Sequence, residues 1–149
     1  MDEKALDPNV PTAIEFALRA GLRAVHMGPD QGIKLLMPLE SNANHVGTMY
    51  AGALFTLAEV MGGAAFRTYM LDPGVFPIVK GLNIKFTKPA RTDITAEYKM
   101  DQADADKILA ECLEVGKANY DISLELKDET GLVVAVSDGY YQIRKGTTF

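Results

Sequence analysis

The chain has 149 residues, the size of one ordinary domain that can enclose a hydrophobic core. Hydrophobic residues make up 48% and charged residues 23%, which is the balance of a soluble globular protein. The net charge of −5 argues against nonspecific binding of nucleic acid, which requires a basic surface. A single cysteine, Cys112, excludes an internal disulfide and suits a reducing compartment. The start, MDEKALDP, is acidic, so we expect no secretory signal and a cytoplasmic protein.

The first predicted element is a helix that opens at Pro11 and Thr12 and ends at the turn GPDQG, residues 28–32. Thr12 and Glu15 have the spacing of a capping box. Apolar residues recur at helical spacing through the segment: Ile14, Ala17, Leu18, Leu22 and Val25. We expect His26 to be structural, because a cation near a helix C-terminus interacts favourably with the helix dipole.

Four segments alternate apolar and other residues in the manner of strands: residues 33–37, 82–87, 93–100 and 118–127. A fifth strand is predicted over residues 132–144, after the turn DETG, and is expected to be buried on both faces over much of its length. This patterning predicts antiparallel pairing with one face on a core. Between the third and fourth segments, residues 105–115 predict a short amphipathic helix in which Cys112 is a packing residue.

A nearly uncharged segment after the first of these strands predicts a helix from about Ala51 to Tyr69. A helix that is apolar all round lies inside a protein. The segment is long enough to suggest a membrane span, but its central carboxylate, its glycines and the lack of a second span favour a buried helix. The adjacent Gly62 and Gly63 suit a close approach to a sheet or another helix.

One long central helix and about five to six strands predict an α+β fold in which an antiparallel sheet wraps around the helix. We expect one domain over residues 1–149. Half-buried strands leave edges that a second copy of the chain can cover, which favours a homo-oligomer.

Glu59 is the only charge between Val46 and Phe66. Burying an unpaired carboxylate is costly, and such a group usually has a partner or a raised pKa. Chemistry is one common reason for it to persist. The alternative is a structural carboxylate that is satisfied by a buried hydrogen bond.

Asn44 and Glu59 stand seven residues before and eight residues after Ala51. If Ala51 lies in the first helical turn, its N–H and that of Gly52 have no intrahelical partner and can bind a carbonyl oxygen that gains negative charge. Asn44 could hydrogen-bond the same carbonyl or orient a water, and Glu59 could act as nucleophile or general base. Eight helical residues span about 12 Å, so Glu59 of one subunit should serve Ala51 of another.

The motif NxxGxxxAGxLxTLAE, which starts at Asn44, and the later IKFTKPA resemble the hotdog-fold acyl-CoA thioesterase superfamily. They are closest to its small single-domain branch, which includes phenylacetyl-CoA thioesterases. The resemblance implies a hotdog fold, a thioester hydrolase, a homodimer or tetramer, and no cofactor besides the coenzyme A of the substrate. It implies an amide side chain from Asn44, a backbone amide from Ala51 and a catalytic carboxylate from Glu59. The chain departs from the family where Tyr50-Ala51-Gly52 replaces the common His-Gly-Gly.

Coenzyme A is polyanionic, so an acidic protein needs local cations to bind it. Lys85, Lys88 and Arg91 cluster around one strand end and are the candidates, with Lys80 a weaker one. The alternative is a solvated strand edge with lysines that oppose aggregation.

Tyr50 and Phe55, with Met49 and Met61, are candidates for an acyl pocket, although such residues at helical spacing are more often core. His45 follows Asn44 and could partly replace the missing family histidine. The alternative for His45 is a loop histidine in solvent.

Two other functions remain open. A hotdog module could bind an acyl or aromatic ligand without cleaving it, as the Tyr50-Ala51-Gly52 departure suggests. A hydratase or dehydratase would pair a histidine with a carboxylate, and His45 is the available histidine. The sequence has no glycine-rich phosphate loop, zinc-ligand pattern or nucleophile elbow. We therefore expect a small acyl thioester as partner, and no metal, membrane or nucleic acid; the acyl group and its carrier stay open.

Overall fold

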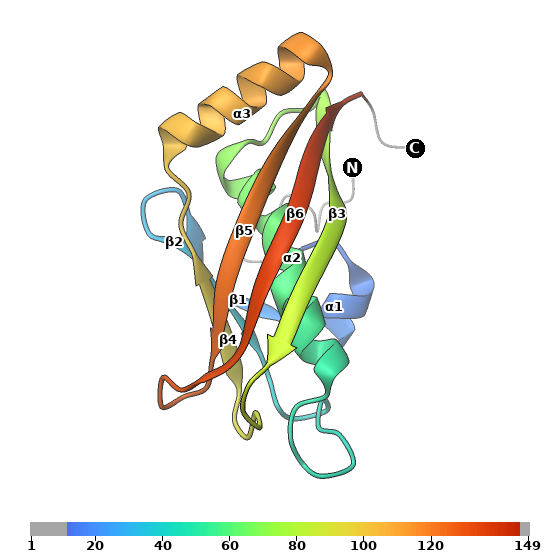
Figure 1. The fold of residues 1–149 in the computed structure, drawn as a ribbon, viewed down its shortest axis with the longest axis vertical. Coiled ribbons are helices and arrows are strands. Elements are labelled where there is room, and N and C mark those ends of the chain that lie inside the picture. Colours follow the sequence, from blue (N-terminus) through green and yellow to red (C-terminus); the bar gives the residue numbers. More distant parts are fainter. Residues whose placement is uncertain (1–11, 147–149) are drawn as a thin grey trace.

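The computed structural model describes residues 12–146 (Figure 1). Three helices and six strands occur in the following order: α1 (Glu15–Arg19), β1 (Arg23–Gly28), β2 (Gly32–Met37), α2 (Ala51–Tyr69), β3 (Val75–Phe86), β4 (Ile94–Tyr98), α3 (Gln102–Val115), β5 (Lys117–Lys127) and β6 (Val133–Lys145). The strands form one antiparallel sheet in the order β1-β2-β4-β5-β6-β3. The sheet wraps around α2 (Figure 1), which confirms the predicted α+β architecture.

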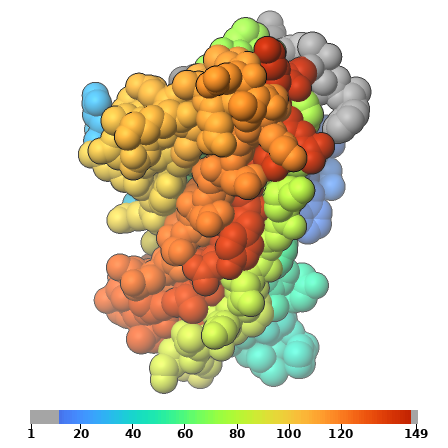
Figure 2. Space-filling model, turned by 45° about the horizontal axis from the view of Figure 1, so that its top comes forward, coloured from blue at the N-terminus to red at the C-terminus, as the bar shows by residue number. Residues whose placement is uncertain are grey.

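The core lies between α2 and the inner face of the sheet. Strand β5 shows the alternation clearly, because every second residue from Ala118 to Leu126 is buried. Most residues of α2 are buried against this face, among them Leu57, Met61 and Ala65. Helix α3 packs against β5 and β6 at one end of the sheet (Figure 2), where the buried Cys112 is a packing residue as predicted.

Gly62 is the point of closest approach between α2 and the sheet. A Cβ at this position would overlap the ring of Tyr141 on β6. A Cβ at Gly63 would meet nothing within 4 Å. The prediction of a close approach is therefore right for Gly62, whereas Gly63 is exposed on the other side of the helix.

The N-terminal segment differs from the prediction of one helix up to residue 28. Helix α1 ends at Arg19, and residues 23–28 form β1, which pairs with β2. Gly21, with a φ of +92°, reverses the chain between the two elements. Hydrogen bonding to β2 stabilises a strand where local periodicity favours a helix, because tertiary context overrides propensity.

The capping box predicted from Thr12 and Glu15 is also wrong. The Thr12 hydroxyl accepts a hydrogen bond of 3.1 Å from the N–H of Ile14, and no side chain caps α1. His26 lies on β1, with its Nδ1 atom 3.2 Å from the carbonyl oxygen of Gly32. Its environment is that of a sheet residue, so the predicted interaction with a helix dipole does not exist.

Strand β3 begins at Val75, seven residues before the predicted start. It forms one edge of the sheet, and an edge strand tolerates Pro77 because one row of its N–H groups has no partner strand. Within residues 12–146, no helix is long and apolar enough to cross a membrane.

Candidate active site

One face of α2 is not covered by the sheet. Its residues recur at every fourth position, which places them on one side of a helix; they are Ala51, Phe55, Glu59 and Gly63, named here the α2 strip. Glu59 is half-buried on this strip. The prediction of a buried central helix is therefore confirmed for most of α2, and this strip is the exception.

Glu59 lies in a groove of about 400 Å³ between α2, β3 and the start of α1, named here the Glu59 groove. Its apolar walls come from three elements: Ile14 and Phe16 at α1, Phe55 and Val60 on α2, and Val79 and Leu82 on β3. Burial raises the pKa of the Glu59 carboxyl above its ordinary value of 4.5. Among the described residues, none donates a hydrogen bond to this carboxylate or forms an ion pair with it. The structural alternative, a carboxylate satisfied by a buried hydrogen bond, has no support in this arrangement.

Two stacked tyrosines of the sheet hold the helical turn that carries Glu59. The Tyr141 hydroxyl donates to the backbone carbonyl oxygen of Glu59 at 3.1 Å, and the Tyr120 hydroxyl donates to that of Gly62 at 2.8 Å. The two ring centroids are 5.4 Å apart. Burial raises the pKa of both phenols, and both remain donors at neutral pH. Sequence reasoning missed this pair, although inward-facing tyrosines opposite a helical glycine are a signal for it.

The start of α2 presents two free amides. The N–H groups of Ala53 and Leu54 donate to the carbonyl oxygen of Tyr50 at 2.9 and 3.2 Å. Within the described part of the chain, the N–H groups of Ala51 and Gly52 have no hydrogen-bond partner. They can therefore stabilise a developing oxyanion, with the positive end of the helix dipole behind them.

The loop before α2 carries three of the predicted site residues, Asn44, His45 and Tyr50. The Tyr50 ring is 59% exposed and lies against Gly52, where a Cβ would overlap it. The Asn44 side-chain oxygen accepts from the N–H groups of Val46 and Thr48, and its nitrogen donates to the Thr48 hydroxyl at 2.9 Å. Asn44 thus shapes the loop and keeps one amide hydrogen free. His45 is exposed in the same loop.

The predicted cations divide into two groups. Lys88 and Arg91 are exposed in the loop after β3, and the Met49 N–H donates to the carbonyl oxygen of Ala90 at 2.8 Å. This bond holds the loop beside the start of α2. Lys85 is exposed on β3 opposite Val136, on the outer face of the sheet, and is separated from the Glu59 groove.

The weaker candidate, Lys80, lines the Glu59 groove. The pairing of β3 with β6 shifts register between Val79 and Gly81, so Lys80 is the extra residue of a β-bulge. Bulges change the direction of side chains and are common beside active sites. Two other pocket candidates, Met49 and Met61, are buried core residues.

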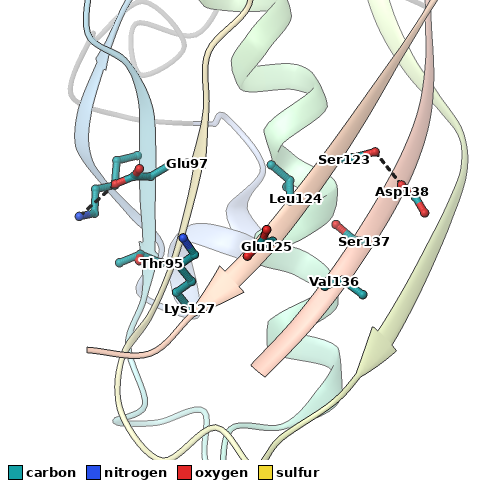
Figure 3. Close-up of a pocket in the computed structure, with 10 residues that line it drawn as sticks. Thr95, Glu97, Ser123, Leu124, Glu125, Lys127, Val136, Ser137 and Asp138 are labelled. Atoms are coloured by element: carbon teal, nitrogen blue, oxygen red, sulfur yellow. Dashed lines mark hydrogen bonds and ion pairs between the residues drawn. The ribbon is translucent and has the colours of Figure 1, made fainter. Parts of the chain in front are cut away.

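A second hollow of about 620 Å³ lies on the outer face of the sheet (Figure 3). Its polar side chains bind one another: Lys34 and Glu97 form an ion pair of 3.3 Å, and the Ser123 hydroxyl donates to Asp138 at 2.6 Å. None of the residues predicted for the site lies in this hollow. The catalytic candidates are therefore those of α2.

A family model described as a domain of unknown function, DUF4442, matches residues 15–141. The chain belongs to the DUF4442 family. This DUF4442 chain has 46% sequence identity to a protein from Pseudomonas aeruginosa whose crystal structure is known. That protein is described as a protein of unknown function and probable thioesterase. The TM-score is 0.82, and the match covers 89% of this chain and 88% of that chain. None of the curated proteins that were compared with the chain matches it.

More distant structures share the fold of the DUF4442 chain. A thioesterase from Haemophilus influenzae has 16% identity and a TM-score of 0.65, covering 89% of this chain and 85% of its own. A hypothetical thioesterase from Streptococcus pneumoniae, solved with coenzyme A, has 13% identity and a TM-score of 0.62, covering 90% and 96%. These neighbours are hotdog-fold proteins, which confirms the predicted fold and the resemblance to the hotdog thioesterase superfamily.

Proposed function

We propose that this protein is a thioesterase that hydrolyses an acyl-CoA-like thioester at a site shared by two subunits. The observation that carries the proposal is the arrangement on α2. Among the described residues, the Ala51 and Gly52 amides at its start and the half-buried Glu59 carboxylate on the α2 strip have no hydrogen-bond partner. The similarity to a protein described as a probable thioesterase supports the same reaction.

In the proposed reaction, the thioester carbonyl oxygen accepts hydrogen bonds from Ala51 and Gly52 of one subunit. Glu59 of the partner subunit takes a proton from water, whose oxygen attacks the carbonyl carbon. The carbon–sulfur bond then breaks, and the proton passes to the leaving thiolate. Burial makes Glu59 a stronger base than an ordinary carboxylate, which suits this role. Direct attack by the carboxylate is the alternative, with water then hydrolysing the acyl-enzyme.

The two-subunit arrangement follows from distance and from the surface beside α2. Along one helix Ala51 and Glu59 are about 12 Å apart, too far to act on the same carbonyl. Strand β3 is a sheet edge, and its Val79 and Phe86 are 45% and 50% exposed. Antiparallel pairing of β3 with its copy would cover this edge and bring two α2 strips face to face. We therefore propose a homodimer.

Lys88 and Arg91 are the proposed contacts to the phosphates of coenzyme A. Both lie beside the start of α2, at the end that receives the thioester carbonyl. Lys85 faces away from this end, and the structure offers no support for its predicted role.

A second candidate function is a module that binds an acyl ligand without cleaving it. The observation that favours it is the Tyr50 ring against Gly52, which occupies one side of the helix start. Ligand affinity without thiol release distinguishes this function from hydrolysis.

The test is thiol release from short, medium, long and aromatic acyl-CoAs by the wild type and by Glu59→Gln. The expected result is turnover that the variant loses while it keeps the fold and the dimer. Glu114→Gln, an exposed change on α3, is the matched control and should keep full activity. Undiminished turnover in Glu59→Gln would refute the catalytic assignment, and no release from any substrate by the wild type would favour the binding module.

A further inference from the structure

The wall of the Glu59 groove that comes from α1 is unusual for a subunit surface. Ile14 and Phe16 are 48% and 61% exposed, and both side chains line the groove. The neighbouring Ala17 is fully buried and attaches α1 to the core. The exposed Phe16 therefore does not serve to hold α1 in place.

The opposite walls are equally apolar. Phe55 and Val60 of α2 and Val79 and Leu82 of β3 face the same space as Phe16, and Glu59 lies among them. An apolar surface that converges on one unpaired carboxylate suits a ligand with an apolar body and a reactive polar end. A thioester with an apolar acyl group has this form.

The size of the groove limits the acyl group. Its volume of about 400 Å³ lies near the lower end of the range of small-molecule sites, about 300–1,000 Å³. Lys80 is exposed at the β3 side, and its ammonium group stays in water while its stem can lie along apolar surface. A long fatty chain would extend beyond these walls, so its outer carbons would gain nothing from contact with them.

We propose that the Glu59 groove holds a medium-length apolar acyl group and that Phe16 is a specificity-determining residue for its outer carbons. The proposal rests on the proposed thioesterase function, because that function places the thioester carbon beside Glu59. Phe16 lies outside the Asn44–Glu59 motif. Acyl selection would therefore depend on a segment of the chain that does not contain the candidate catalytic residues.

The test uses S-alkyl-CoA thioethers, which have no carbonyl to hydrolyse and report binding independently of turnover. Dissociation constants are measured by calorimetry for S-ethyl-, S-butyl-, S-hexyl-, S-octyl- and S-dodecyl-CoA. In the wild type, affinity should rise by about fourfold for each buried methylene and stop rising before dodecyl. The Phe16→Ala variant should bind S-ethyl-CoA like the wild type and S-octyl-CoA at least tenfold more weakly.

Two further variants make the test specific. Ile14→Ala, on the same wall as Phe16, should also weaken the longer ligands selectively, whereas Tyr140→Ala, an exposed aromatic change on β6, should leave every dissociation constant unchanged. An equal effect of Phe16→Ala on all lengths, no effect, or no thioether binding would overturn the proposal. If light scattering shows that Phe16→Ala loses the dimer while the dependence of affinity on chain length is unchanged, that result would also overturn the proposal and assign Phe16 to the subunit interface.

The thioesterase function is judged separately, by thiol release from the matching acyl-CoAs. Length-dependent thioether binding without thiol release would refute hydrolysis and leave the assignment of the groove intact. Thiol release with a length dependence that Phe16→Ala does not alter would support hydrolysis and overturn the role of Phe16.

Discussion

The Tyr141 hydroxyl of β6 donates a hydrogen bond of 3.1 Å to the backbone carbonyl oxygen of Glu59, and its oxygen lies 3.4 Å from that of Ala58. The bond joins residues that are 82 positions apart. It attaches the turn of α2 that carries Glu59 to β6, the strand beside the edge strand β3, while the Glu59 side chain lines the groove. Under the proposed function, a base held by such a contact keeps its position when substrate arrives, which is what general-base catalysis requires.

Replacing Tyr141 with phenylalanine should destabilise the protein by about 1 kcal/mol, the net contribution of a typical intramolecular hydrogen bond. The ring stack with Tyr120 survives, so the loss should come from the hydroxyl. Urea denaturation measures the free energy of unfolding. The neighbouring Tyr140→Phe is the control and should be neutral, because Tyr140 is exposed. Equal stability of the two variants would contradict the importance of the Tyr141 bond.

Gly62 and Gly63 should respond in opposite directions to alanine. Gly62→Ala should lower the free energy of unfolding by about 1–3 kcal/mol, because the added methyl overlaps the Tyr141 ring. Gly63→Ala should raise it by up to about 1 kcal/mol, because alanine is the better helix former and its methyl meets nothing within 4 Å in the subunit. Urea denaturation of both variants checks the prediction. If Gly63→Ala instead lowers the free energy of unfolding, and lowers it more in dilute protein, Gly63 contacts a partner subunit.

Ala51→Pro should remove one oxyanion donor without damage to the helix. Proline has no N–H, is favoured at the first helical position, and requires an extended preceding residue. Tyr50, with a ψ of 136°, already has that conformation. Turnover should fall by about 10²–10³-fold, while the melting temperature stays unchanged. Ala51→Ser keeps the N–H and should keep most of the activity; an active Ala51→Pro protein would exclude this amide from catalysis.

Mixing Ala51→Pro with Glu59→Gln tests whether the site spans two subunits. When the two inactive proteins are unfolded and refolded together, half of the dimers are mixed, and each mixed dimer has one site with both groups intact. Activity should therefore return to about one quarter of the wild-type value. Co-refolded protein that stays inactive, although mass spectrometry shows mixed dimers, would mean that both groups act within one subunit.

The pH dependence of stability should report the burial of Glu59. Burial raises the folded-state pKa above 4.5, so the folded protein binds this proton more tightly than the unfolded chain. The contribution of Glu59 to stability is therefore fully present below about pH 4.5 and is lost as pH rises through the folded-state pKa. The free energy of unfolding of Glu59→Gln minus that of the wild type should increase as pH rises through this window and then become constant. Urea denaturation at several pH values measures it, and a constant difference would contradict the shift.

Glu59 should also shape the pH profile of turnover. A general base must be ionised, so kcat/KM should rise with pH along an acid limb whose midpoint lies above 4.5. Thiol release measured across pH gives this midpoint. A midpoint at or below 4.5, the ordinary pKa of this carboxyl, would mean that the Glu59 carboxylate is solvated in the active protein.

The sequence by itself determined the central helix and most of the sheet. The bounds of α2 agree with the prediction, because an apolar segment ended by LDPG has a local signal at both ends. Strand β5 follows its period-two pattern closely. Residues 23–28 were wrongly predicted because their helical periodicity competes with pairing to β2, and the stronger interaction is not local.

The separation of Ala51 and Glu59 could also be predicted from the sequence, because positions along one helix have known separations. What only the tertiary structure decided is the surroundings of that helix. The sheet buries all but one strip of α2. Phe16 of α1 and Lys80 of β3 line the same groove as Glu59, and Tyr141 of β6 donates a hydrogen bond to the Glu59 backbone carbonyl. These contacts join segments far apart in the chain, and they form because burying apolar surface brings α1, β3 and β6 together around one helix.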